Sequence, residues 1–286
     1  MQQKGCELAK NKIHGRLKGV RDLHYMPVDV FGESDTNEFF LKKTANKRIL
    51  IAAHDFYDSP HGGTLHFYPD FYEWMNRLGE ISEDTNYDWY IKTHPFLRGR
   101  GREILGEITE KFPKLVLLPP KVTHNQIISE GIDLALTVYG TIATEYPLFG
   151  IPVLNASSNN PHRAYEFSIT PRDRQEYEQL LRNLDLIPRH SKSEEIYEYY
   201  FMHNILPIKN WVFLSDEKYK QDTGFGFKPM TREIYTYFIN TDNKIEKVER
   251  DEAIRSYLWT GDNFLNREHF DRNSNSGIDR FLQGNT

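Results

Sequence analysis

The sequence of 286 residues is long enough for one large domain or two smaller ones, and its composition, 38% hydrophobic and 27% charged, is typical of a globular protein. Its net charge of −5 provides no overall basic field, so nucleic acid is not an expected partner. The single cysteine, Cys6, excludes an intramolecular disulfide and a cysteine-based zinc site.

The N-terminal run MQQKGCELAKNK lacks the apolar core of a signal peptide, and no stretch approaches the roughly 20 apolar residues of a membrane span. We therefore expect a cytoplasmic protein whose membrane association, if any, is peripheral, at the inner face of the membrane. Local basic clusters such as Arg98, Arg100 and Arg102 are still able to meet phosphates.

The order of predicted elements changes at residue 48. Residues 1–47 are polar with weak periodicity, so we expect an irregular segment there and interpret it as a lead-in or a remnant of a further domain. Short apolar runs typical of strands then alternate with amphipathic helical patterns. The predicted strands cover 48–53, 87–92, 114–118, 133–138 and 151–155, and the predicted helices cover 68–78, 103–112, 125–130 and 173–184.

This alternation predicts an α/β fold with a Rossmann-like parallel sheet over residues 48–185, covered by helices on both faces. The strands are apolar almost throughout, which agrees with burial on both sides. Residues 186–286 have a different character. The run EEIYEYYFMHNIL predicts an aromatic helix, and we expect this helical extension to end in a polar tail.

Polar and titratable residues follow the predicted strands, at the sheet edge where open α/β folds bind ligands. The candidates are His54, Asp55 and Asp58 after the first strand, Lys92 and His94 after the second, Gly140, Thr141, Thr144 and Glu145 after the fourth, and Asn159 and His162 after the fifth. Each has an ordinary alternative as a turn, cap or loop residue, and their repeated occurrence at one edge is what favours a site.

The run from Ile132 to Asn155 is the most informative, because a strand leads through a Gly-Thr turn into a short helix. Backbone N–H groups at such a turn suit a phosphate, and Thr141 and Thr144 add hydroxyl groups. Glu145 is placed to accept hydrogen bonds from sugar hydroxyls. The pattern predicts a site for a nucleoside monophosphate or diphosphate.

Several other site classes are disfavoured. His54, Asp58 and His61 resemble a metal-ligand set, but such residues in a glycine-rich loop more often form turns, so no metal is predicted. The sequence has no Gly-x-Gly-x-x-Gly after the first strand, no P-loop and no Gly-x-Ser-x-Gly elbow. We therefore expect no dinucleotide or other cofactor.

With these residues in view, about half of the chain resembles the C-terminal, donor-binding half of GT-B-fold glycosyltransferases, and especially those of bacterial capsule and surface-polysaccharide biosynthesis. The likeness rests on the Lys-x-His-Pro element at 92–95 and on the Gly-Thr turn leading to Leu-x-Gly-x-Pro-Val at 148–153. It implies that His94 and the Gly140–Thr141 turn hold the donor phosphate, and that Glu145 holds the ribose.

The resemblance implies a nucleotide-sugar donor and a glycan or lipid-linked acceptor as partners, with the base drawn from His54, Asp55 or Asp58. Such enzymes normally carry an acceptor-binding half before the donor half. We therefore expect that this chain is a fragment or short form of a longer transferase, or that another chain supplies the acceptor-binding half. One alternative is a UDP-N-acetylglucosamine 2-epimerase-like enzyme, because residues 145–153 resemble the Glu-x-Pro-x-x-Gly-x-Pro-Val element of that family. The others are a polyol-phosphate transferase and a non-catalytic subunit of a polysaccharide assembly complex. CMP-, UDP- and GDP-linked donors all stay open.

Overall fold

The computed structural model describes residues 2–20, 28–32, 38–58, 66–97, 99–188 and 192–205. The chain forms two compact units, one of Lys10–Tyr199, which contains the sheet, and one of Met1–Ala9 with Tyr200–Thr286. The sheet unit is longer at both ends than the predicted domain of 48–185. The predicted polar tail lies outside the described residues.

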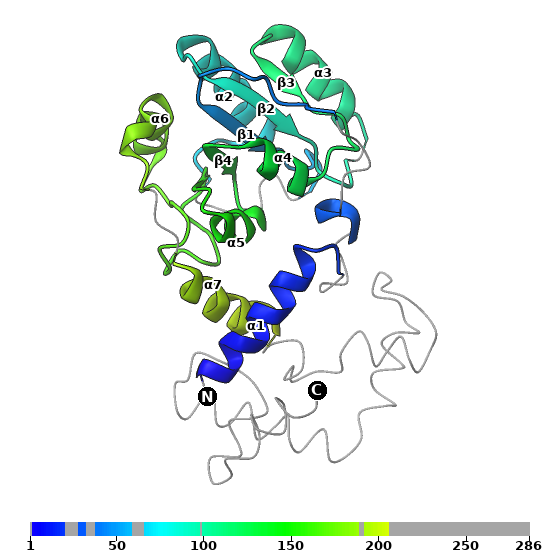
Figure 1. Ribbon diagram of the computed structural model, residues 1–286. Coiled ribbons are helices and arrows are strands. Elements are labelled where there is room, and N and C mark those ends of the chain that lie inside the picture. Colours follow the sequence, from blue (N-terminus) through cyan, green and yellow to red (C-terminus); the bar gives the residue numbers. More distant parts are fainter. Residues whose placement is uncertain are drawn as a thin grey trace, which may run out of the picture. The chain divides into compact units, whose positions relative to one another are not determined.

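A five-stranded sheet forms the centre of the larger unit (Figure 1). All its strand pairs are parallel, and the spatial order is β3-β2-β1-β4-β5. After β3, at one edge, the chain returns to the middle of the sheet and adds β4 and β5 on the other side of β1. The strands are β1 (Arg48–Ala52), β2 (Asp88–Lys92), β3 (Leu115–Leu117), β4 (Leu134–Thr137) and β5 (Val153–Asn155). This architecture confirms the predicted α/β class.

Side chains of β1 alternate between two cores on opposite faces of the sheet. Ile49 and Ile51 pack with helices α2, α3 and α6, whereas Leu50 packs with α4 and α5. Strand β1 is central, between β2 and β4, and because both faces of the sheet are packed it is buried on both sides, as its continuous apolar sequence predicts. The helices are α2 (Phe71–Asp84), α3 (Gly101–Lys111), α4 (His124–Glu130), α5 (Ile142–Glu145) and α6 (Arg174–Arg182).

Side-chain caps fix the ends of several helices. Helix α2 begins at Phe71, three residues later than predicted, because the Asp70 carboxylate accepts a hydrogen bond from the Glu73 N–H at 2.8 Å. Inside this core, the Trp74 indole N–H donates to the Tyr177 hydroxyl at 3.0 Å, which joins α2 to α6. Helix α5 is a single turn that continues as the 3-10 helix η2 (Tyr146–Phe149).

Helix α1 (Gln2–Arg16) shows that the prediction of an irregular segment over 1–47 was wrong in its first part. Its buried hydrophobic residues are Ala9 and Ile13, followed by Leu17 just after the helix, so they recur every four positions. A stripe this narrow gives little periodic signal. A short 3-10 helix, η1 (Val28–Phe31), follows later in the same segment.

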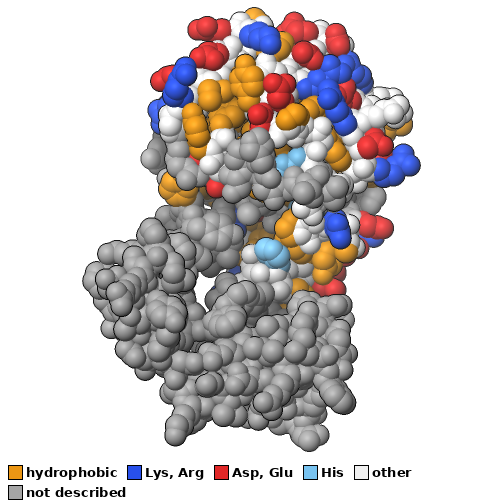
Figure 2. Space-filling model, turned by 180° about the vertical axis from the view of Figure 1, so that it is seen from behind, with side chains coloured by type: hydrophobic (Ala, Val, Ile, Leu, Met, Phe, Trp, Pro, Cys, Tyr) orange, Lys and Arg blue, Asp and Glu red, His pale blue; other side chains and the backbone are white. Residues whose placement is uncertain are grey.

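The predicted aromatic helix is present as α7 (Ser193–Tyr200), which continues as one π-helical stretch, η4 (Phe201–Ile205). None of the helices in the described part of the chain is both long and apolar enough to cross a bilayer. The face shown in Figure 2 carries acidic and basic side chains interspersed over the sheet unit, in keeping with the small net charge.

Candidate functional site

The ends of β1 and β4 are joined by the side chain of His54. Its Nε2 accepts a hydrogen bond from the Val138 N–H at 3.1 Å and lies 3.0 Å from Thr137 Oγ1. The ring stacks on Phe71, with 4.6 Å between ring centres. Burial, followed by the nearby His94 and His66, lowers the pKa of His54 to about 3. The imidazole is therefore neutral, and its Nε2 supports the β4 turn.

The turn after β4 uses many of its own polar groups. The Thr137 hydroxyl accepts from the Gly140 N–H at 2.9 Å, and a Cβ at Gly140 would lie 2.6 Å from that hydroxyl oxygen, so only glycine fits. The Thr144 hydroxyl donates to the Thr141 carbonyl at 2.8 Å. The Gly140 N–H is therefore already bonded and not available to a phosphate, and a helix of one turn such as α5 has only a small dipole.

Glu145 is buried and paired with an arginine that the sequence pattern did not reveal. The guanidinium of Arg16, at the end of α1, forms an ion pair with the Glu145 carboxylate, and its Nη2 also donates to Thr141 Oγ1 at 3.2 Å. The two side chains are 6% and 2% exposed. No spacing rule connects positions 129 residues apart, so only the fold brings Arg16 to this turn.

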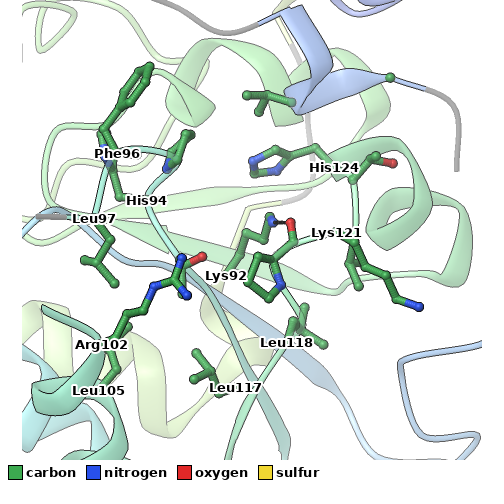
Figure 3. Close-up of a pocket in the computed structure, with 17 residues that line it drawn as sticks. Lys92, His94, Phe96, Leu97, Arg102, Leu105, Leu117, Leu118, Lys121 and His124 are labelled. Carbon is green, nitrogen blue, oxygen red and sulfur yellow. Dashed lines mark hydrogen bonds between the residues drawn. The ribbon is translucent and has the colours of Figure 1, made fainter.

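A pocket of about 750 Å³ lies at the carboxyl ends of β2 and β3 (Figure 3). Helices α3 and α4 contribute their first turns, and η1 contributes Val30. Among the described lining residues every ionisable side chain is a lysine, arginine or histidine: Lys92, His94, Arg102, Lys121 and His124. A cavity with this lining favours an anionic ligand.

Lys92 projects into the middle of the pocket in Figure 3, and its ammonium group donates to the Pro120 carbonyl at 2.8 Å. Arg102 and Lys121 lie on opposite sides of it. His94 follows the same strand, and its Nδ1 accepts from the Phe96 N–H at 3.2 Å. Lys92 and His94, which were predicted as site residues, both line this pocket, and so do Lys121 and His124, which were not.

His124 connects the pocket to the Glu145 turn. Its Nδ1 lies 2.8 Å from the Tyr146 hydroxyl, and its ring stacks on Phe31 with 5.0 Å between ring centres. Burial lowers the pKa of His124 to about 3, and the charges of Lys92 and Arg16 add to this effect. The imidazole is therefore neutral, with the charges of Lys92 and Arg16 nearby.

The remaining candidates lie elsewhere at the edge. Asp55 is buried and its Oδ1 accepts from the Tyr57 N–H at 3.3 Å, so it caps its own turn, whereas Asp58 is exposed. His162 is buried, and its Nε2 lies 3.4 Å from the Nδ2 of Asn155. Asn159 is exposed. The described residues include no group of three or more His, Cys, Asp or Glu side chains that could hold a metal. His61 lies outside them.

No protein-family model and no curated protein matches the sequence. Several solved structures are similar in fold, of which three are described. A UDP-GlcNAc 2-epimerase from Neisseria meningitidis bound to UDP-GlcNAc is 17% identical, with 58% of this chain and 45% of that chain covered and a TM-score of 0.39. MnaA of S. aureus, solved with UDP, is 16% identical, with 65% and 49% covered and a TM-score of 0.37.

The third is a sialyltransferase from Photobacterium damselae, represented by its GT-B domain. It is 15% identical, with 55% of this chain and 35% of that chain covered and a TM-score of 0.27. The chain therefore spans less than half the length of each of these three structures.

Proposed function

We propose that this chain binds a nucleotide-activated sugar and belongs to a glycosyltransferase that builds capsule or other surface polysaccharide. The observation that carries the proposal is the pocket at the carboxyl ends of β2 and β3, whose described ionisable lining is entirely basic or histidine. A nucleoside diphosphate or monophosphate carries its negative charge on phosphate, and it is the class of ligand that such a lining complements.

In this proposal the phosphates lie against Lys92 and His94, with Arg102 supplying a planar guanidinium that can bind phosphate oxygens in a bidentate manner. Thr141, on the neighbouring turn, adds a hydroxyl group. Glu145 accepts hydrogen bonds from the ribose once its carboxylate becomes accessible. Asn159 and His162 stay candidates for contacts with the sugar of the donor.

The proposed chemistry is displacement at the anomeric carbon of the sugar. The acceptor hydroxyl oxygen forms the new C–O bond, the bond from the anomeric carbon to the phosphate oxygen breaks, and the nucleotide leaves with the electron pair. Lys92 and Arg102 stabilise the charge that develops on the leaving phosphate. The acceptor proton passes to a base, for which His54, Asp55 and Asp58 are the candidates. Asp58 fits best of the three because it is exposed, whereas Asp55 is buried and the His54 Nε2 already accepts the Val138 N–H.

A nucleotide-sugar 2-epimerase is the second candidate function. The run Glu145–Val153, which suggested it, forms α5, η2 and the turn into β5, and Gly150 adopts a φ of +75° there. An epimerase would use the same phosphate contacts but would return an isomerised nucleotide sugar without releasing the nucleotide. A transferase releases the nucleotide and forms a new glycosidic bond, so product analysis separates the two.

The first test is a thermal-shift panel with CMP, CDP, UDP, GDP, TDP and NAD. We expect stabilisation by the nucleotide of the donor and a loss of affinity in His94→Ala, worth roughly 1.5–3 kcal/mol for a hydrogen bond to a charged group. His203→Ala, which removes an exposed histidine outside the pocket, is the matched control. No stabilisation by any nucleotide, or equal affinity in wild type and His94→Ala, would contradict the assignment of His94.

A further inference from the structure

The ion pair between Arg16 and Glu145 places two opposite charges out of contact with water, at the proposed nucleotide site. Removing two charges from water is costly, and an ion pair in the interior often contributes little net stability for that reason. The pair also comes from distant parts of the chain, since Arg16 ends α1 and Glu145 ends α5. A contact with these properties is suited to a role other than stability.

The carboxylate of Glu145 is not accessible in this structure, because the whole residue is 1% exposed. A ribose can therefore reach it only after a neighbouring group has moved. Arg16 is the group that holds the carboxylate, and it also holds Thr141 Oγ1 on the same turn. Two of the predicted nucleotide contacts on this turn, Thr141 and Glu145, are thus occupied by one guanidinium.

The end of α1 is held by contacts with α4 and α7, since His14 Nε2 lies 3.0 Å from the Tyr197 hydroxyl of α7. Ile13 and Leu17 are buried, and the Leu17 carbonyl accepts a hydrogen bond from the Asn125 side chain at 3.0 Å. Asn125 belongs to α4, the helix whose first residue, His124, lines the pocket. The segment that carries Arg16 therefore lies beside the pocket and can respond to what the pocket contains.

We propose that Arg16 is an autoinhibitory contact, in which its guanidinium and the ribose hydroxyls of a nucleotide compete for the carboxylate of Glu145. This inference rests on the proposed function, because it needs a ligand with a ribose at this turn. In the absence of nucleotide Arg16 closes the turn. Binding of nucleotide releases Arg16, so the apparent affinity is lowered by the fraction of molecules in which Arg16 is bound.

The test compares the affinity of wild type and Arg16→Lys for UDP and CMP by titration calorimetry. Lysine keeps the positive charge but lacks the planar fork of donors, so it holds the carboxylate less well. We expect Arg16→Lys to bind the ribonucleotide about tenfold more tightly, the change for a closed fraction of about nine-tenths in wild type. The affinity for 2′,3′-dideoxy-UDP should rise much less than that for UDP, because that ligand cannot use Glu145.

The matched control is Arg172→Lys, which alters an exposed arginine paired with Glu176 at 3.0 Å. It should leave every affinity unchanged. Weaker ribonucleotide binding by Arg16→Lys would identify Arg16 as a direct ligand and overturn the proposal, and so would equal binding. If wild type and the variants bind neither UDP nor CMP, the proposed function fails together with this inference.

A second measurement uses wild-type protein and does not depend on the folding of a variant. Hydrogen exchange of the α1 amides in residues 10–16 is followed with and without saturating UDP. We expect faster exchange with UDP, because release of Arg16 loosens the end of α1. Slower or unchanged exchange upon UDP binding would contradict the proposal.

Discussion

Replacing His124 by asparagine is expected to make folding of the sheet unit less sensitive to acid. His124 is buried, and burial together with the charges of Lys92 and Arg16 lowers its pKa from 6.5 to about 3. Asparagine can still form a hydrogen bond with Tyr146, since its amide occupies the position of the imidazole Nδ1, but it does not titrate.

The effect of His124 on the free energy of unfolding arises because, below pH 6.5, its side chain binds a proton in the unfolded chain but not in the folded one. This histidine contributes nothing to the pH dependence well above pH 6.5, and stability is lost as the pH falls from 6.5 toward 3. Each pH unit in this window costs about 1.4 kcal/mol. At pH 5.0, which is 1.5 units below 6.5, the loss is about 2 kcal/mol of the free energy of unfolding.

Urea unfolding at pH 7.5 and pH 5.0, followed by the fluorescence of the buried Trp74 and Trp89, measures this loss. We expect the difference between the two pH values to be about 2 kcal/mol smaller in His124→Asn than in wild type. Other titrating groups cancel in the comparison, and His203→Asn serves as the control. An equal pH dependence in wild type and His124→Asn would refute the reasoning.

Three further predictions concern stability and use the same urea assay. Gly79→Ala should lower the free energy of unfolding by about 1–3 kcal/mol, because its Cβ would lie 2.2 Å from Phe112 Cδ2, and Phe112→Leu should relieve part of that loss. Tyr177→Phe should cost about 1–3 kcal/mol, because the buried Trp74 N–H loses its acceptor, and an unchanged midpoint would contradict this. Asp70→Ala should cost about 1 kcal/mol through loss of the α2 cap, and a stability equal to that of wild type would contradict the cap's role.

The sheet could be predicted from sequence because burial on both faces makes each strand a short apolar run. Each predicted strand agrees with an observed one, with ends that differ by two residues at most, as for 151–155 against β5 (Val153–Asn155). Helix ends depend on caps that a periodicity argument does not weigh, which is why α2 begins after Asp70 rather than at Tyr68. Helix α1 was missed because its buried stripe includes a residue as small as Ala9.

The candidate site was predictable only where it follows from topology. Lys92 ends β2 and His94 comes two residues later. The rule that open parallel sheets bind ligands beyond the carboxyl ends of their strands therefore predicts both residues near the pocket that they line. Lys121 and His124 belong to a loop and a helix start whose direction depends on packing. Arg16 reaches Glu145 only through the docking of α1, and no local pattern encodes that contact.

Because the pocket is lined by basic side chains, the anions of the buffer are expected to affect the nucleotide affinity that is measured. Inorganic phosphate and sulfate are small anions, and Lys92, Arg102 and Lys121 attract them in the same way as they attract the phosphate of a nucleotide. In a phosphate buffer these ions compete with the nucleotide, so a titration there gives a weaker apparent affinity than one in a zwitterionic buffer. The ratio of the two affinities then measures how strongly the pocket holds an inorganic anion by itself.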